Sequence, residues 1–202
     1  MTSGINDLRF AVVDIETTGL EPSESHILQI AAVLCDSSGT VEGTWVTYVK
    51  PPRWPFSTLG PRHVHGISRL ALRRAPTAAT ALQALAPYLE GRVFTAHNVE
   101  FDLPFLQHHA GRLGVRLPTG PVVCTLALSR SLDRSASRSH RLTDLCDRYG
   151  VVLGRAHDAL EDARATAGVL AHLIDESRVA SPAELYAAAA PNGRRRPAQR
   201  RP

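Results

Sequence analysis

Four acidic residues and one histidine have the types and spacing that metal-assisted hydrolysis needs: Asp14, Glu16, Asp102, Asp162 and His157. Asp14 and Glu16 close an apolar run at residues 9–16, which reads as a buried strand. Because side chains alternate along a strand, both carboxylates project from the same face. A polar strand end that leaves the core is the other interpretation of such a pair.

The other two acids lie near helix starts. Asp102 follows a short apolar run at residues 92–96, and Asp162 lies one turn into a helix that begins near Ala159. An acid in a first helical turn also interacts favourably with the helix dipole, which is the ordinary structural explanation for both positions. Glu161 directly precedes Asp162, so at least one of the two must point away from the other's face.

Four carboxylates that converge repel one another, and divalent cations among them relieve that repulsion. Oxygen ligands without cysteine favour hard ions such as Mg²⁺ or Mn²⁺. Two ions roughly 3.5–4 Å apart would clamp the attacking and leaving oxygens of a phosphoryl displacement.

If His157 and Asp162 belonged to the same helix, their side chains would lie about 140° apart around its axis. We therefore expect His157 on the loop before the helix, where it could act as a general base; a surface or capping histidine is the alternative.

The elements that must position these residues alternate along the chain. Three successive strands, which suggest an antiparallel meander, are predicted at residues 9–16, 26–35 and 44–50. A long irregular, proline-rich segment follows from Pro51 to Pro61. Short strands are predicted at 92–96 and 122–124, and helices at 77–89 (with Pro87 as a kink or early stop), 100–113, from about 125, 142–149, 159–176 and after Ser181. This order predicts an α/β fold, with a mixed sheet flanked by helices.

Polar and glycine residues mark the helix ends. Asp158 is the candidate N-cap of helix 159–176, and Asn98 or Glu100 could cap helix 100–113. Gly150 closes helix 142–149. Ser181 begins a capping-box pattern with proline at the first helical position, which predicts a short terminal helix.

Length and composition fit one domain with a substantial core: the chain has 202 residues, 44% hydrophobic and 21% charged. No run of about 18 apolar residues could cross a membrane, and residues 1–7 lack the features of a secretory signal. Three cysteines without CxxC spacing favour reduced thiols, so we expect a cytoplasmic protein.

The net charge of +4 comes from the C-terminus. Residues 194–202 carry five arginines and no acid, and residues 1–193 carry 18 basic and 19 acidic side chains, a net charge of −1. This distribution excludes a uniformly basic nucleic-acid coat, although it does not exclude nucleic-acid binding. We expect the tail to be disordered, either as a phosphate-binding arm or as a solubilising end.

Three segments together resemble the motifs of the DEDDh 3′–5′ exonucleases, which include the proofreading epsilon subunit of bacterial DNA polymerase III and stand-alone relatives. They are DIETTGL at residues 14–20, HNVEFD at 97–102 and HDALEDA at 157–163. His65-Gly66-Ile67 also matches that family's HGI segment. The likeness runs from about Arg9 to Leu173, and a tyrosine-type relative would carry tyrosine where this chain has Asp158.

The resemblance implies a ribonuclease H-like fold and two Mg²⁺ or Mn²⁺ ions. It makes Asp14, Glu16, Asp102 and Asp162 the metal-binding acids and His157 the general base for the attacking water. It also implies contacts with the 3′-terminal nucleotide from four consecutive residues, Thr17, Thr18, Gly19 and Leu20. Further substrate contacts of lower rank are His65, Ile67, His97, Asn98 and Phe101. For Leu20 and Phe101, packing in the core is the alternative.

The implied activity is release of nucleoside 5′-monophosphates from the 3′ end of DNA, single-stranded or frayed, in proofreading or repair, with a DNA polymerase as a candidate partner. A 3′–5′ exoribonuclease is one alternative, and a non-catalytic nucleic-acid-binding module is another. The expected organisation is an N-terminal lead at 1–8, an exonuclease domain at 9–176, a short terminal helix within 177–191 and a basic tail at 192–202.

Overall fold

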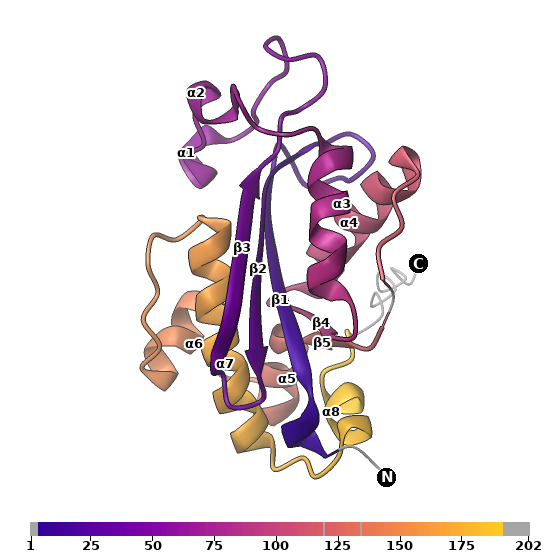
Figure 1. The fold of residues 1–202 in the computed structure, drawn as a ribbon. Coiled ribbons are helices and arrows are strands. Elements are labelled where there is room, and N and C mark those ends of the chain that lie inside the picture. Colours follow the sequence, from indigo (N-terminus) through magenta and orange to yellow (C-terminus); the bar gives the residue numbers. More distant parts are fainter. Residues whose placement is uncertain (1–3, 119, 134, 192–202) are drawn as a thin grey trace, which may run out of the picture.

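A computed structural model of the chain describes residues 4–118, 120–133 and 135–191. Its centre is one mixed sheet of five strands in the order β3-β2-β1-β4-β5 (Figure 1). The strands are β1 (Arg9–Thr17), β2 (Ile27–Asp36), β3 (Val41–Tyr48), β4 (Val93–Ala96) and β5 (Val122–Cys124). The predicted sheet is therefore confirmed, although the third strand begins three residues earlier than the sequence pattern suggested.

The first three strands form the predicted antiparallel meander, and β4 and β5 extend it in parallel with β1. β4 pairs only with Phe10–Val12, so the second half of β1 has no strand partner on that side. This difference in length leaves one side of β1 open to other elements near Asp14 and Glu16.

Helices cover both faces of the sheet (Figure 1). They are α3 (Ala78–Leu89) and α4 (Val99–Leu113) on one face, and α5 (Thr125–Leu132), α6 (Leu142–Tyr149), α7 (Ala159–Ser177) and α8 (Pro182–Ala188) on the other. Alternate residues of β1 supply the two cores: Phe10 and Val12 pack under α7, whereas Ala11 and Val13 pack under α3 and α4. A short 3₁₀ turn, Ile5–Asp7, precedes β1.

Residues 51–76, which we call the lobe, lie beyond the end of the sheet where β1 and β3 finish (Figure 1). The sequence suggested an irregular segment, but two one-turn helices form there, α1 (Arg62–His65) and α2 (Arg69–Leu72). They form because Leu59, Ile67 and Leu72 bury their side chains against Leu28 of β2. The lobe therefore has a small core of its own, anchored on the sheet.

Several predicted helix ends are confirmed. The Asp158 carboxylate accepts a hydrogen bond from the Leu160 amide at 3.2 Å, and the Ser181 hydroxyl accepts one from Glu184 at 3.3 Å. Asn98 occupies the N-cap position of α4 but makes no side-chain cap hydrogen bond. Pro87 lies inside α3, which continues to Leu89.

No helix in the described ranges is long and apolar enough to span a membrane. Cys35, Cys124 and Cys146 are buried free thiols, as the sequence predicted. The predicted disordered tail at 192–202 lies outside the described residues.

Candidate active site

β1 carries Asp14 and Glu16 to the face of the sheet that α7 covers. Their side chains alternate with Val13 and Ile15, which point into the opposite core. Asp14 pairs with Ala31 and Glu16 with Gln29 on the neighbouring strand, and both carboxylates are half-buried. The two-residue period therefore placed both acids on one face, as the sequence predicted.

Asp102 approaches the same site from α4. β4 ends opposite Val12, and the chain then enters α4, so the first turn of that helix lies beside the unpaired half of β1. The Asp102 side chain is buried, with only 4% of its surface exposed, and hydrogen-bonds to the backbone of Ile15. This contact places the Asp102 carboxylate next to the backbone of β1.

α7 brings a further acid, Asp162 in its first turn, to the same site. One oxygen of Asp162 accepts a hydrogen bond from the backbone amide of His157 at 3.0 Å. Glu161 turns away, pairs with Arg164 at 2.9 Å and packs against Gly154. The structure thus settles which of the two adjacent acids faces the site.

His157 is exposed and lies on the turn before α7, where the sequence reasoning expected it. Its backbone has φ of 61°, in the left-handed region that costs a non-glycine residue about 1–2 kcal/mol. The hydrogen bond from its amide to Asp162 helps to hold this conformation. A ring nitrogen of His157 and one carboxylate oxygen each of Glu16 and Asp162 lie within 4.8 Å of one another.

The electrostatics show that the four carboxylates act on one another. Burial, followed by the charges of Asp102, Asp162 and Glu16, raises the pKa of Asp14 well above its ordinary value. Burial and the charges of Asp162, Asp158 and Asp102 raise the pKa of Glu16 to about 8.

The two helix acids shift in the same direction. Burial raises the pKa of Asp102 to about 7, against the hydrogen bond from Ile15, which lowers it. Burial also raises the pKa of Asp162, although His157 lowers it through its amide and its charge. Among the described residues, His157 is the only basic side chain whose charge lowers the pKa of one of these four acids.

This donor set fits hard divalent cations. The carboxylate oxygens of Asp14, Glu16, Asp102 and Asp162 are the ligands that such ions prefer, and no thiol lies among them. No lysine or arginine contributes to the shifted pKa of any of these four acids. Cations would therefore supply the compensation that remains beyond the charge of His157.

Thr17–Leu20 leave β1 beside these acids. The Thr17 hydroxyl donates to the carbonyl of Gly19 at 2.6 Å, and the Thr18 hydroxyl accepts from the His26 amide at 2.9 Å. A Cβ on Gly19 would lie 2.6 Å from the Ser25 hydroxyl, so a larger residue there would have to displace the Ser25 side chain. Leu20 is 79% exposed, which excludes the alternative that it is a core leucine.

His65 and Ile67 lie inside the lobe. The His65 ring bonds to the Leu59 carbonyl at 2.9 Å and accepts from the Ile67 amide at 3.0 Å, with 2% of the residue exposed. Ile67 belongs to the lobe's core. Both residues thus shape the lobe, and their contact with substrate stays a prediction.

His97, Asn98 and Phe101 lie on the β4–α4 side. The His97 ring bonds to the Thr125 hydroxyl at 3.0 Å. Burial lowers the pKa of His97 to about 4, against a hydrogen bond with the backbone of His140 that raises it. Phe101 packs against Phe105 with ring centroids 4.9 Å apart, which supports the core interpretation.

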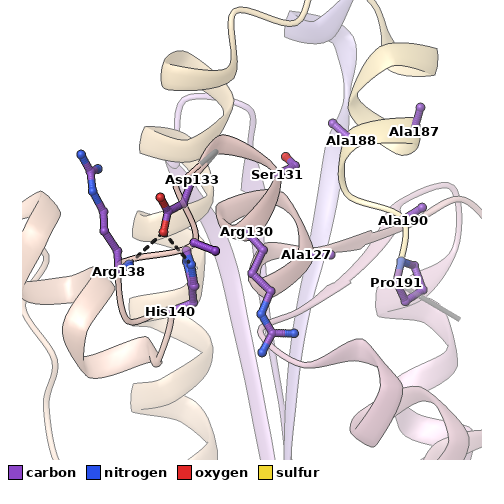
Figure 2. Close-up of a pocket in the computed structure, with 11 residues that line it drawn as sticks. Ala127, Arg130, Ser131, Asp133, Arg138, His140, Ala187, Ala188, Ala190 and Pro191 are labelled. Carbon is purple, nitrogen blue, oxygen red and sulfur yellow. Dashed lines mark hydrogen bonds and ion pairs between the residues drawn. The ribbon is translucent and has the colours of Figure 1, made fainter. Parts of the chain in front are cut away.

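A cavity of about 740 Å³ lies between α5, the loop after it and the end of α8 (Figure 2). The Asp133 carboxylate accepts a hydrogen bond from the Arg138 amide at 2.9 Å and lies 3.4 Å from a ring nitrogen of His140. Figure 2 marks both contacts with dashed lines. None of the four carboxylates of the site is among the residues that line it. This cavity and the carboxylate cluster are therefore separate features.

Sequence reasoning missed Gln29, which joins the two halves of the site. Its side chain is buried opposite Glu16 and accepts a hydrogen bond from the Ala159 amide at 3.4 Å, tying β2 to the start of α7. The available signal was a single polar residue inside the apolar run 27–35.

Comparisons with known proteins identify the family of this chain. A family model described as Exonuclease (RNase_T) matches residues 11–170. The chain is 33% identical over 167 residues to the PolC-type DNA polymerase III of Caldanaerobacter subterraneus subsp. tengcongensis. The aligned region covers 83% of this chain and 12% of that relative. The chain is 35% identical over 181 residues to a putative bifunctional exonuclease/endonuclease protein of Mycobacterium tuberculosis, covering 85% of this chain and 27% of that protein. The chain thus spans only a small part of these relatives.

Two solved structures share the fold. Exonuclease X in complex with 5′ overhanging duplex DNA gives a TM-score of 0.68 at 22% identity, covering 90% of this chain and 99% of that one. Exonuclease I of E. coli in complex with a dT13 oligonucleotide gives a TM-score of 0.73 at 22% identity, covering 85% of this chain and 42% of that one.

Proposed function

This chain belongs to the exonuclease family, and on that premise we propose that it is a metal-dependent 3′–5′ exonuclease that releases nucleoside 5′-monophosphates from the 3′ end of DNA. The observation that carries the proposal is that Glu16, Asp162 and His157 bring ligand atoms within 4.8 Å of one another, while the charges of Glu16, Asp102 and Asp162 raise the pKa of Asp14. We assign residues 9–176 as the catalytic domain, with 1–8 as a lead and 177–191 as the segment that contains α8.

Asp14, Glu16, Asp102 and Asp162 would hold two divalent cations, Mg²⁺ or Mn²⁺. Such ions, when bound, supply Lewis-acid stabilisation of the negative charge that develops in phosphoryl transfer. The chain contributes backbone contacts that position two of these carboxylates, a hydrogen bond between Ile15 and Asp102 and one from the His157 amide to Asp162. Such contacts are what a site needs to position reacting groups.

His157 would take the proton from the attacking water. Its exposure, its place before α7 and its closeness to Glu16 and Asp162 support that role. Thr17–Leu20 would contact the 3′-terminal nucleotide, with the exposed Leu20 side chain against the terminal base. His65, Ile67, His97, Asn98 and Phe101 would act mainly by shaping the walls around that nucleotide.

The proposed substrate is a single-stranded or frayed 3′ end, as in proofreading or repair. The two solved structures compared above hold DNA, one a duplex with a 5′ overhang and the other a dT13 oligonucleotide, which supports a nucleic-acid substrate. A DNA polymerase is a candidate partner, because relatives include PolC-type DNA polymerase III chains. Three buried free thiols support a cytoplasmic location.

An exoribonuclease is the second candidate. It is favoured by one observation, the shared fold of the 3′hExo nuclease domain, which was solved bound to rAMP. A non-catalytic binding module is disfavoured because the chain has all four acids and His157, and three of these five residues, Glu16, His157 and Asp162, lie together.

The deciding experiment compares 3′-labelled single-stranded DNA, mismatched duplex DNA and RNA, each with and without Mg²⁺. We expect stepwise shortening of the DNA from its 3′ end only with the metal. Faster shortening of RNA would move the assignment to the exoribonuclease, and no shortening of any strand with Mg²⁺ or Mn²⁺ would refute the enzyme.

Adjacent acids on α7 provide a matched pair of variants. Asp162→Asn should nearly abolish turnover, whereas Glu161→Gln, which removes a charge that turns away toward Arg164, should keep it. His157→Ala should lower kcat by about 10²–10⁴-fold with little change in substrate binding. Equal activity of the two α7 variants would contradict the assigned site.

A further inference from the structure

The charge of the chain is strongly segregated. Residues 43–89 carry six basic side chains and no acidic one, whereas the rest of residues 1–193 carries 12 basic and 19 acidic side chains. A near-neutral sum over 1–193 therefore hides a basic region next to an acidic one. Five of the six basic residues are arginines of the lobe.

Four lobe arginines are free to meet a partner: Arg53, Arg62, Arg73 and Arg74 are exposed, and none is in an ion pair with an acid in the part of the chain that the structure describes. Arg69 differs. It donates to the carbonyls of Pro55 and, at 2.9 Å, Ser57, and its guanidinium lies 6.0 Å from the Trp54 ring centre. Arg69 therefore ties α2 to the loop at residues 54–57, which follows Arg53.

The lobe is joined to the segment that leaves β1. A Cβ on Gly60 would lie 2.0 Å from the carbonyl oxygen of Thr18, so the two backbones are in direct contact. Burial first, and then the charges of Arg112 and Arg53, lower the pKa of His26, whose amide bonds to Thr18. The positive charge of the lobe thus reaches the edge of the candidate active site.

The lobe also exposes a large aromatic ring. Phe56 is 89% exposed, at the tip of the loop that Arg69 ties to α2, and Leu20 is 79% exposed on the neighbouring segment. Aromatic rings beside cationic side chains are the combination that binds nucleic-acid strands, because the rings stack on bases and the cations meet phosphates. A solvated basic surface alone would not need an exposed phenylalanine.

We propose that the lobe is a nucleic-acid-binding platform for the part of the substrate beyond its 3′-terminal nucleotide, with Arg53, Arg62, Arg73 and Arg74 on phosphates and Phe56 stacked on a base. Its place relative to the 3′ end rests on the proposed function, but its binding of phosphodiester chains does not. The length and strand state of the substrate should therefore affect its binding through contacts at the lobe, away from the carboxylates.

A membrane surface is the other partner that basic and aromatic side chains fit. Contact between the lobe and Thr18, beside the carboxylate cluster, favours a nucleic acid, because one strand can then occupy both surfaces. Vesicles rich in phosphatidylserine therefore serve as a competing probe.

The test measures binding in EDTA, where turnover does not interfere. Fluorescein-labelled single-stranded DNA and duplex DNA, each about 20 nucleotides long, are titrated with the wild type and with Arg73→Gln/Arg74→Gln at several salt concentrations. The double variant should bind at least tenfold more weakly, and the slope of log K against log salt should fall by about 1.4 for single strands, two phosphate contacts at about 0.7 each. The strand form with the larger loss identifies which backbone the lobe binds.

The charge-matched control is Arg9→Gln/Arg178→Gln, which removes the same charge at the far ends of β1 and α7; Arg9, unlike the lobe arginines, is paired with Glu42 at 2.7 Å. It should bind as the wild type does. Phe56→Ala should weaken binding about fivefold or more, and Phe56→Trp should restore it, because stacking needs only an aromatic face.

Equal losses in the control and lobe variants would show a net-charge effect and overturn the platform, as would binding to the vesicles in preference to DNA. Unchanged affinity in the lobe variants would overturn it too. If the wild type binds DNA through the lobe but shortens no strand with Mg²⁺ or Mn²⁺, the proposed function fails and the platform stands.

Discussion

Replacing Gly60 by alanine tests how firmly the lobe is fixed to the chain that leaves β1. Gly60 has φ of 68°, and an added Cβ would lie 2.0 Å from the carbonyl oxygen and 2.6 Å from the carbonyl carbon of Thr18. Gly91 is a matched control, because its φ is also 68° and nothing lies within 4 Å of an added Cβ. The two variants share the same backbone cost and differ only in the contact.

The expected magnitudes follow from those two terms. Alanine in the left-handed region costs about 1–2 kcal/mol, which its lower entropy in the unfolded chain offsets by about 0.4–1 kcal/mol. Gly91→Ala should therefore lose about 1 kcal/mol. Gly60→Ala must also push Thr18 away, and overpacking of this kind costs about 1–3 kcal/mol more. Its free energy of unfolding should fall by about 2–4 kcal/mol.

Urea unfolding followed by circular dichroism measures both variants. With a slope of about 2 kcal/mol per molar urea, the midpoint of Gly60→Ala should lie about 1 M below that of Gly91→Ala at an unchanged slope. Because Thr18 moves in Gly60→Ala, kcat/KM should also fall in that variant alone. Equal midpoints would refute the reasoning, since they would mean that the lobe moves freely away from Thr18.

Two further predictions concern stability away from the site. Leu145→Ala, in the buried core under α6, should cost about 2–5 kcal/mol, whereas Val152→Ala, at a position 89% exposed, should change stability by less than about 0.5 kcal/mol in the same urea assay. Burial, and then the hydrogen bond to Glu176, raise the pKa of Tyr149 to about 12, so the folded state holds this proton more tightly than the unfolded chain. The stability that this proton contributes is present below pH 10 and is lost between pH 10 and 12. The free energy of unfolding of Tyr149→Phe should therefore fall less over that pH range than that of the wild type. Identical pH profiles of the two proteins would contradict this prediction.

The sequence predicted the elements that have a clear period. The strand 9–16, the helix 142–149 and the start of helix 159–176 all agree with the structure to within one residue. The two-residue period also placed Asp14 and Glu16 on one face. These features are local, because each depends on side chains only a few residues apart.

The lobe could not be predicted in the same way. α1 and α2 have four residues each, too few to show a helical period, and four prolines precede them. They are held by Leu59, Ile67 and Leu72 on Leu28, contacts that exist only once β2 is in place. The position of Asp102 is likewise non-local, since it depends on β4 ending before the second half of β1.

The distribution of charge connects the site and the lobe. Every side chain that raises the pKa of Asp14 by its charge is an acid, whereas residues 43–89 have no acid at all. The acids of the site therefore repel a phosphodiester, whereas the arginines of the lobe attract it. The two effects come from different residues and can be changed separately. Removing divalent cations should thus abolish turnover but leave binding to the lobe, whereas neutralising Arg73 and Arg74 should weaken binding while the carboxylates keep their affinity for cations. Loss of strand binding in EDTA as complete as the loss of turnover would show instead that the carboxylates and their cations provide the only attachment.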